Sequence, residues 1–228
     1  MPDSRPTLSN DYRIVLWIVA AVAFAIRIAA AVALDGLHHP HISEYDAIAR
    51  NMLAGRGFSY LHLGVVYYSY IAPLPAWTSA ASYWLSGSLA PAMMLQIAAG
   101  TALPVVTAVI ARRLFGGWVA PFASGLLIAL HPGLVLYSAA KMHALAFDAF
   151  FFSLVLLQAF RLADRLTTRR AVELGLIVGI GVYSRATIVI FLPIAGLWLL
   201  IVVPRHARRS AIRAVAIATL CAAAVVGP

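Results

Sequence analysis

The sequence has few of the residues that build disulfide-bonded, metal-binding or soluble proteins. It contains one cysteine, Cys221, so neither an internal disulfide nor a cysteine-based metal site can form within one chain. Only 11% of its 228 residues are charged and 63% are hydrophobic, a balance that excludes an ordinary soluble domain. It has no internal repeat and no low-complexity linker. It has instead a series of long apolar runs, which predicts a membrane protein.

Seven apolar segments predict an all-α polytopic membrane protein with about seven transmembrane helices. The first, Ile14–Leu34, has 21 residues, which at about 1.5 Å per residue cross a hydrocarbon core of about 30 Å. A cleaved signal peptide is the alternative, because Ala31-Val32-Ala33 imitates a cleavage site. The segment is long for such a peptide and contains Arg27, so we favour a retained anchor. The other segments are Ala90–Ala111, Trp118–Ala140, His143–Phe160, Val172–Tyr183, Ala186–Val203 and Ala211–Val226.

Residues 171–203 are predicted to form two short spans rather than one long helix. A single helix of 33 residues would be about 50 Å long and would place the arginines on its two flanks on opposite sides of the membrane. We therefore predict a break at Ser184-Arg185, which leaves Arg185 below the outer surface in a cavity lined by protein. Another break is expected at His131-Pro132-Gly133, because proline cannot continue a helix.

The net charge of +9 could indicate a nucleic-acid partner, but the placement of the basic residues indicates membrane orientation instead. With the N-terminus inside, inner connections hold 12 of the 17 Lys and Arg residues and outer connections hold 4. We therefore predict a cytoplasmic tail (residues 1–13) and a transmembrane module (residues 14–228) whose first extracytoplasmic loop is residues 36–77. The inner set is Arg5, Arg13, Arg112, Arg113, Arg161, Arg165, Arg169, Arg170, Arg205, Arg208, Arg209 and Arg213, and the outer set is Arg50, Arg56, Lys141 and Arg185.

The first outer loop is the only long segment too polar for a bilayer, and it is predicted to carry amphipathic surface helices. The clearest of these helices covers Ser43–Ala54. Ser43 is a suitable N-cap, and Gly55 supplies the C-terminal stop. Asp46 and Arg50 are four residues apart and are expected to pair, which favours a structural role for Asp46.

Several side chains of this loop could take part in acid–base or metal chemistry. Glu44 has no basic partner three or four residues further along the helix, so it is a candidate for a free catalytic carboxylate. The alternative is a structural role, in which Glu44 only compensates the helix dipole. His41 could act as a general base, since the unperturbed pKa of histidine is about 6.5. A divalent metal is only weakly supported, because no defined ligand spacing is present in the cluster His38, His39, His41 and His62.

Other ionisable residues lie inside or at the outer ends of the predicted spans. Arg27 and Asp148 both lie about 10 Å below the outer interface, so we predict that they form a structural ion pair, directly or through water. The alternative is a proton relay. Lys141, His143 and Arg185 gather at the outer ends, where cations can bind a lipid phosphate. Snorkelling to lipid headgroups is the alternative, and it suits Lys141 better than the deeper Arg185.

Five motifs in order resemble bacterial GT-C glycosyltransferases of the protein O-mannosyltransferase and aminoarabinose-transferase superfamily. The resemblance runs from about Arg27 to Pro193, and it is the combination rather than any single motif that is specific. The motifs are Tyr45–Phe58 (YDAIARNMLAGRGF), Pro73-Leu-Pro75, Ala111–Gly116 (ARRLFG), Ala129–Pro132 (ALHP) and Gly175–Arg185.

The resemblance implies a membrane enzyme that transfers a sugar from a polyprenyl-phosphate donor to a lipid, glycan or protein acceptor. It implies that the first outer loop is the active site and that an acid four residues before Tyr45 activates the acceptor hydroxyl. That position is His41, so the motif is altered and Glu44 is the nearest replacement. It also implies that Arg185 holds the donor phosphate and that His143 stands at a second acid position. The candidate catalytic residues are Glu44, His41 and Asp46, and the candidate substrate-binding residues are Arg185, Lys141, His143, Arg56 and Tyr45.

The resemblance therefore implies an inverting glycosyltransferase in the bacterial cytoplasmic membrane, and we expect membrane lipid as a partner and no nucleic acid. Members of the resembled superfamily are longer, so the chain corresponds to their N-terminal module. One alternative is a truncated or non-catalytic module that binds polyprenyl phosphate or a partner transferase. Another is a small transporter, although the polar groups gather at the outer rim and not at a midplane site between repeats.

Overall fold

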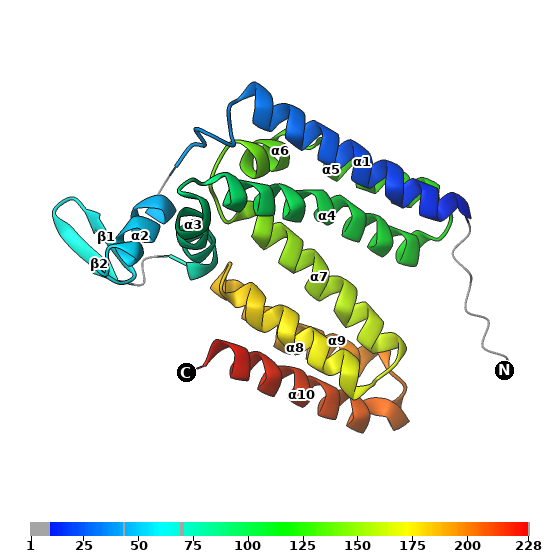
Figure 1. Cartoon of the computed structure of the whole chain (residues 1–228). Coiled ribbons are helices and arrows are strands. Elements are labelled where there is room, and N and C mark those ends of the chain that lie inside the picture. The colour runs from blue at the N-terminus through cyan, green and yellow to red at the C-terminus, as the bar shows by residue number, and fades with distance from the viewer. Residues whose placement is uncertain (1–9, 43, 69–70, 228) are drawn as a thin grey trace.

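The computed structural model describes residues 10–42, 44–68 and 71–227, which fold almost entirely into helices (Figure 1). This confirms the prediction of an all-α membrane architecture. Ser43, the predicted N-cap, lies outside the described residues, as do residues 1–9 of the predicted tail. The elements are α1 (Asn10–Ala33), α2 (Glu44–Leu53), β1 (Ser59–His62), β2 (Val65–Tyr68), α3 (Pro73–Ser86), α4 (Ala90–Phe115), α5 (Val119–Leu130), α6 (Pro132–Ala139), α7 (Leu145–Asp164), α8 (Thr168–Val182), α9 (Phe191–Val202), α10 (Arg208–Val226) and the 3-10 helices η1 (Ala186–Ile190) and η2 (Arg205–Ala207).

Within the described residues, four helical segments are long and apolar enough to cross a membrane on their own: α1, α4, α7 and Arg205–Val226, which contains α10. A fifth candidate is α5 with α6, two helices bent by 54° at the break predicted around Pro132. The fifth and sixth predicted spans correspond to α8 and to the shorter apolar segment Ala186–Val202. The prediction of two short helices around Ser184-Arg185 is therefore confirmed.

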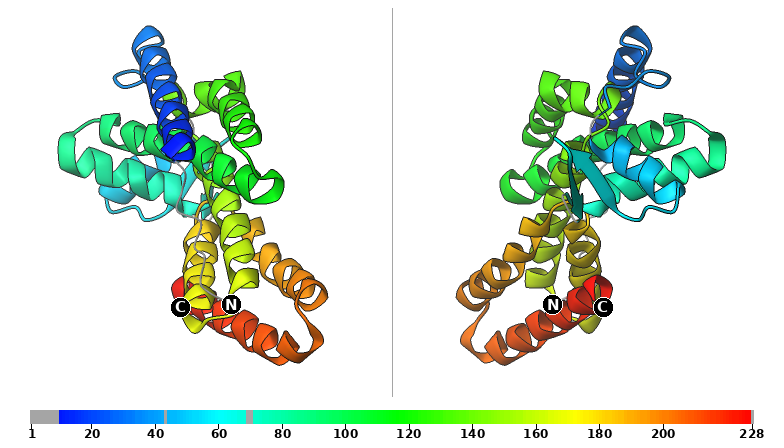
Figure 2. Two further views of the ribbon diagram at one scale, coloured as in Figure 1. Left: turned by 90° about the vertical axis from the view of Figure 1, so that its right-hand side faces the viewer. Right: turned by 90° about the vertical axis from the view of Figure 1, so that its left-hand side faces the viewer.

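The helices form two groups that are joined by α7 (Figure 2). One group contains α1, α4, α5 and α6, and the other contains α8, α9 and α10. Helix α7 packs against α4 on one side and against α8 on the other. A site that uses residues from both groups must therefore form along α7 or at its ends.

Small residues bring α8 and α10 close together. A Cβ atom added to Gly175 would lie 2.4 Å from the carbonyl oxygen of Ala218 and 2.7 Å from Cβ of Cys221. One turn further along α8, Gly179 faces the carbonyl oxygen of Ala222. Glycines and alanines spaced about four residues apart allow helix backbones to approach closely in a membrane. This packing fixes the direction of α8 and thus the position of the residues that follow it.

The two ends of the bundle differ in composition. Helix α2, the antiparallel hairpin β1–β2 and α3 cover one end, at the left of Figure 1, which we call the loop end. The last turn of α4, with Arg112 and Arg113, and the first turns of α8 and α10 lie at the other end, which we call the arginine-rich end. The outer-loop candidates and most arginines thus lie at opposite ends of the bundle.

Candidate active site

A buried carboxylate joins α7 to the residues that follow α8 at the loop end. The hydroxyl of Ser184 donates to Oδ1 of Asp148 over 2.5 Å, and Nε of Arg185 donates to Oδ2 over 2.7 Å. The Asp148 side chain is 4% exposed, whereas that of Arg185 is 48% exposed. No described residue takes a hydrogen bond from the two terminal nitrogens of Arg185. The carboxylate thus holds one edge of the guanidinium and leaves the rest open to a ligand.

The predicted ion pair between Arg27 and Asp148 is wrong. Arg27 is fully buried in α1, and its Nη1 donates to the carbonyl oxygens of Ala23, at 3.0 Å, and of Ala129, at 3.3 Å. Ala129 lies in the last turn of α5, where the break at Pro132 interrupts the backbone hydrogen bonds of the helix. The prediction placed the two residues at similar positions along their helices but could not include the rotation of the helices about their axes. Arg27 faces α5, and Asp148 faces the end of α8.

The segment between α6 and α7 is held by the buried side chain of Gln96. Its Nε2 donates to the carbonyl oxygens of Tyr137, at 2.8 Å, and Lys141, at 2.6 Å, and its Oε1 accepts from the backbone N–H of His143 at 3.1 Å. Gln96 lies in the second turn of the apolar helix α4 and has no exposed surface. Its amide therefore decides where Lys141 and His143 lie.

His143 is placed as a neutral hydrogen-bond donor. Its Nδ1 accepts from the backbone N–H of Leu145 at 3.0 Å, so the proton of the neutral ring is on Nε2. Burial lowers the pKa of His143. This effect exceeds the opposite effect of the nearby carboxylates of Asp148 and Glu44, which raise the pKa. The ring meets Tyr45 edge-on, with 6.1 Å between centroids. This arrangement favours donation by Nε2–H over a role as general base.

Helix α2 brings Glu44 and Tyr45 close to His143. Tyr45 packs with Ile48, Ala76 and Ala144, so the inner face of α2 lies against α3 and the start of α7. Burial, together with the charges of Glu44 and Asp148, raises the pKa of Tyr45 to about 12. The carboxylate of Glu44 is partly exposed and forms no hydrogen bond or ion pair with a described residue. It remains available to a substrate.

Asp46 pairs with Arg50, as their spacing predicted. Nε of Arg50 donates to Oδ2 of Asp46 over 3.0 Å, and the hydroxyl of Tyr83 in α3 donates to Oδ1. Both carboxylate oxygens are thus engaged, and they tie α2 to α3. Gly55, with φ of +74°, ends the helix as predicted.

The four histidines proposed as metal ligands do not converge. His38 and His39 both contact the carboxylate of Asp35, while His62 stacks on Tyr60 in the hairpin. Within the described ranges, no three His, Cys, Asp or Glu side chains form a group that could hold a metal ion. His41 instead joins Lys141 through its backbone, whose N–H donates to the carbonyl of Ala140 at 2.8 Å.

Of the remaining candidates, Lys141 is near the cluster and Arg56 is not joined to it. Nζ of Lys141 lies 4.8 Å from the centre of the Tyr137 ring, beside His143. Arg56 lies exposed in the turn after α2, and its side chain does not contact these residues in the described part of the chain. Sequence reasoning missed Gln96, Ser184 and Tyr83. An uncharged polar residue inside an apolar run, such as Gln96, is the signal that could have found the first.

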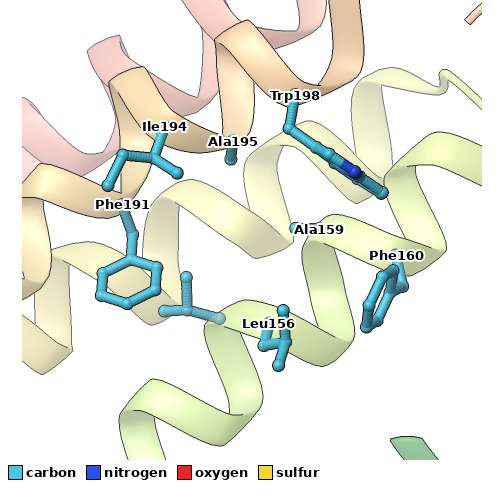
Figure 3. Close-up of a pocket in the computed structure, with 8 residues that line it drawn as sticks. Leu156, Ala159, Phe160, Phe191, Ile194, Ala195 and Trp198 are labelled. Carbon is cyan, nitrogen blue, oxygen red and sulfur yellow. The ribbon is translucent and has the colours of Figure 1, made fainter. Parts of the chain in front are cut away.

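An apolar pocket lies between α7 and α9, away from these polar groups (Figure 3). Its volume is about 240 Å³, and its lining includes Phe160, Phe191 and Trp198. No carboxylate, imidazole or cation is among its lining side chains. The pocket can accept a hydrocarbon chain but supplies no acid–base group and no charge.

Comparison with protein families identifies the class of protein to which this cluster belongs. Residues 71–228 match the family described as dolichyl-phosphate-mannose-protein mannosyltransferase. The chain belongs to this family. A comparison with curated proteins found no match.

Membership of the mannosyltransferase family confirms the resemblance to GT-C membrane glycosyltransferases and makes the chain a multi-pass membrane protein of that type. The matched region begins just before α3 and ends at Pro228. It includes Gln96, Asp148 and Arg185 but not α2, which carries Glu44. The phosphate-binding candidates therefore lie within the matched region, and the candidate base lies N-terminal to it in the sequence.

Proposed function

We propose that this protein transfers a sugar from a polyprenyl-phosphate donor to an acceptor hydroxyl at the loop end. Family membership supports the reaction class, and the cluster around Asp148 supports the location. Cationic groups there can bind a phosphate, and a free carboxylate can accept a proton. The sidedness of the arginines supports a cytoplasmic N-terminus and an extracytoplasmic active site in the bacterial inner membrane.

The proposed reaction is a single inverting displacement. The carboxylate of Glu44 accepts the proton of the acceptor hydroxyl, whose oxygen attacks the anomeric carbon of the donor sugar. The bond between that carbon and the phosphate oxygen breaks as the new glycosidic bond forms. Polyprenyl phosphate leaves as an anion, and Arg185, with Lys141, balances its charge. His143 donates from Nε2 to an oxygen of the bound substrate.

The observation that best supports the proposal is how Arg185 is held and how far its side chain is exposed. A buried carboxylate fixes one edge of its guanidinium, yet about half of the side chain is exposed. The buried Asp148 fixes the direction of the guanidinium, and no described residue takes the donors of its two terminal nitrogens. An arginine oriented in advance, with free donors, is suited to a phosphate that arrives and leaves. Asp148 and Ser184 are positioning residues in this view, because they act through Arg185.

The apolar pocket supports a lipid-linked donor. It is lined by Phe191, the first residue of α9, which lies six positions after Arg185 in the chain. A donor whose phosphate is bound by Arg185 can place its hydrocarbon chain along this helix. We propose that the pocket accepts part of the polyprenyl chain.

The test is donor turnover by the purified chain and its variants. A polyprenyl-phosphate-linked sugar is supplied in membranes that contain the natural acceptors, and released polyprenyl phosphate is measured. Glu44→Gln should lower release by about 10²–10⁴-fold and leave donor binding, measured by native mass spectrometry, unchanged. Glu173→Gln removes a carboxylate at the other end of the bundle and is the matched control. Arg185→Ala should weaken binding of polyprenyl phosphate, and Arg185→Lys should restore part of it.

The outcomes separate the proposed function from its alternatives. Full activity of Glu44→Gln would remove Glu44 as the base. Donor binding by the wild type without release, under all acceptor conditions, would indicate a binding module. Uptake of substrate into vesicles without sugar transfer would indicate a transporter.

A further inference from the structure

A small polar pocket lies at the arginine-rich end, far from the candidate active site. It is formed where the first turn of α8 meets the first turns of α10, and its volume is about 100 Å³. Its polar lining comes from Thr167, Thr168, Ser210 and Arg213. Ligand pockets for drug-sized molecules measure about 300–1,000 Å³, so this one suits a single small group.

The lining groups are those that bind an oxyanion. The hydroxyls of Thr168 and Ser210 can donate hydrogen bonds, and the guanidinium of Arg213 can donate two parallel ones. The Thr167 oxygen accepts from the backbone N–H of Arg170 at 3.4 Å, so its hydroxyl proton can point elsewhere. In the part of the chain that the structure describes, Arg213 forms no ion pair or hydrogen bond through its side chain.

The surrounding charge is positive and is not neutralised by the protein. Asp164 is bound by Arg113, and Glu173 is bound by Arg169 and Gln158. These are the acidic side chains of the α7–α8 connection and the first turns of α8. On the α10 side, no ion pair to a described acid is made by Arg205, Arg208, Arg209 or Arg213. This end of the bundle therefore attracts an anion from outside the chain.

We propose that this pocket binds the phosphate of an anionic phospholipid headgroup. The pocket is at the end of membrane-spanning helices, where headgroups lie, and the rest of its lining is apolar, from Leu166, Ala214 and Ile217. Basic pockets between transmembrane helices are suited to acidic headgroups, whose acyl chains then lie along the apolar helix surfaces. A free phosphate has the same oxyanion chemistry but no use for the apolar side. The site is independent of the proposed transferase reaction.

The binding test uses the full chain purified in detergent and depleted of lipid. Native mass spectrometry then measures how much dioleoylphosphatidylglycerol it retains, with dioleoylphosphatidylcholine as the neutral comparison. Each Lys or Arg near a membrane surface contributes about 1 kcal/mol to binding of acidic lipid, which is about fivefold. We expect Arg213→Gln to lower retention of the phosphatidylglycerol by about fivefold or more, and Arg213→Lys to keep part of it.

Arg209→Gln is the matched control, because Arg209 is an exposed arginine of the same helix that does not line the pocket. Measurements at raised salt screen diffuse surface attraction, so there only the pocket variants should lose lipid. Equal loss in Arg209→Gln at raised salt would overturn the proposal, as would equal retention of phosphatidylcholine. Binding of inorganic phosphate with no preference for the phospholipid would assign the pocket to free phosphate instead. Thermal unfolding of each variant checks that its fold is intact.

Discussion

The two ends of the bundle handle charge in opposite ways. At the loop end a buried carboxylate, Asp148, holds one arginine, and a buried amide, Gln96, holds the neighbouring chain segment. At the arginine-rich end the groups are mostly exposed, and the Arg169–Glu173 pair has side chains 89% and 37% exposed. Exposed pairs contribute little to stability, whereas breaking a buried pair leaves a charge without a partner. At the loop end, buried polar groups therefore fix the positions of their partners, whereas the arginine-rich end carries exposed net positive charge.

The largest effect is expected from Asp148→Asn, which tests the buried side of this comparison. The amide carries no charge to neutralise Arg185, and one of the two oxygens that accept from Ser184 and Arg185 is replaced by a donor. Because Arg185 is about half exposed, we expect a loss of about 1–3 kcal/mol in unfolding free energy, together with weaker binding of polyprenyl phosphate. Thermal unfolding and native mass spectrometry measure the two effects.

Asp164→Asn is the control for Asp148→Asn, because Asp164 is the partner of Arg113 at the other end. It should cost less stability and leave binding of polyprenyl phosphate unchanged. If the two variants lose equal amounts of both, the distinction between the two ends is wrong.

The second-largest effect is expected from substitution of two buried glutamines, Gln96 toward the loop end and Gln158 toward the arginine-rich end. Gln96→Leu leaves the carbonyls of Tyr137 and Lys141 and the N–H of His143 without their partner, at about 1–3 kcal/mol for each group that water cannot reach. Gln158→Leu removes contacts to the Arg170 carbonyl and to Glu173. Both variants should melt at lower temperature, but only Gln96→Leu should also reduce sugar transfer.

Gln96→Glu sharpens this result, because it keeps the shape and places a carboxylate against two carbonyl oxygens. It should be at least as harmful as Gln96→Leu. If both Gln96 variants transferred sugar at the wild-type rate, the segment between α6 and α7 would not need this amide.

Much of the fold follows from the sequence, because lengths, prolines and glycines act locally. The break at Pro132, the division around Ser184-Arg185 and the stop at Gly55 each depend on a few neighbouring residues. The pairing of Asp46 with Arg50 was also predictable, since both lie on one helix. These features need no knowledge of how helices pack.

The partners of Asp148 and Arg27 could not be predicted in this way. Each depends on how a helix is rotated about its axis, which is set by contacts such as Gly175 against Ala218 far along the chain. The sequence predicted that Lys141, His143 and Arg185 gather at one end, and the structure places all three there. It did not predict that Gln96 holds two of them or that Asp148 holds the third, because those contacts join residues more than 35 positions apart.

A third prediction concerns pH and separates two groups of histidines at the loop end. Burial lowers the pKa of His143, so the unfolded chain binds a proton more readily than the folded one. Stability is then full above a pH of about 6.5 and falls as the pH drops below it. His143→Gln should flatten this decline between about pH 7 and pH 5, measured by thermal unfolding.

His39→Gln is the control, because His39 contacts Asp35 on an exposed surface. The contacts with His39 and His38 lower the pKa of Asp35, and the stability linked to that carboxylate is lost only as the pH falls through its lowered value. The decline below pH 6.5 should therefore persist in His39→Gln. A profile that flattens in His39→Gln and not in His143→Gln would contradict the burial of His143.

The smallest effect is expected at Arg169, compared with Arg50. Both arginines pair with an acid four residues away on their own helix. Arg169→Gln removes one exposed contact and should cost about 0.3–0.5 kcal/mol, vanishing at high salt. Arg50→Gln should cost about 1 kcal/mol, because it also removes the contacts with Tyr83 in α3 and leaves the buried Asp46 with one partner. Thermal unfolding at low and high salt distinguishes them: equal, fully salt-sensitive losses would show that α2 is held no more specifically than the arginine-rich end.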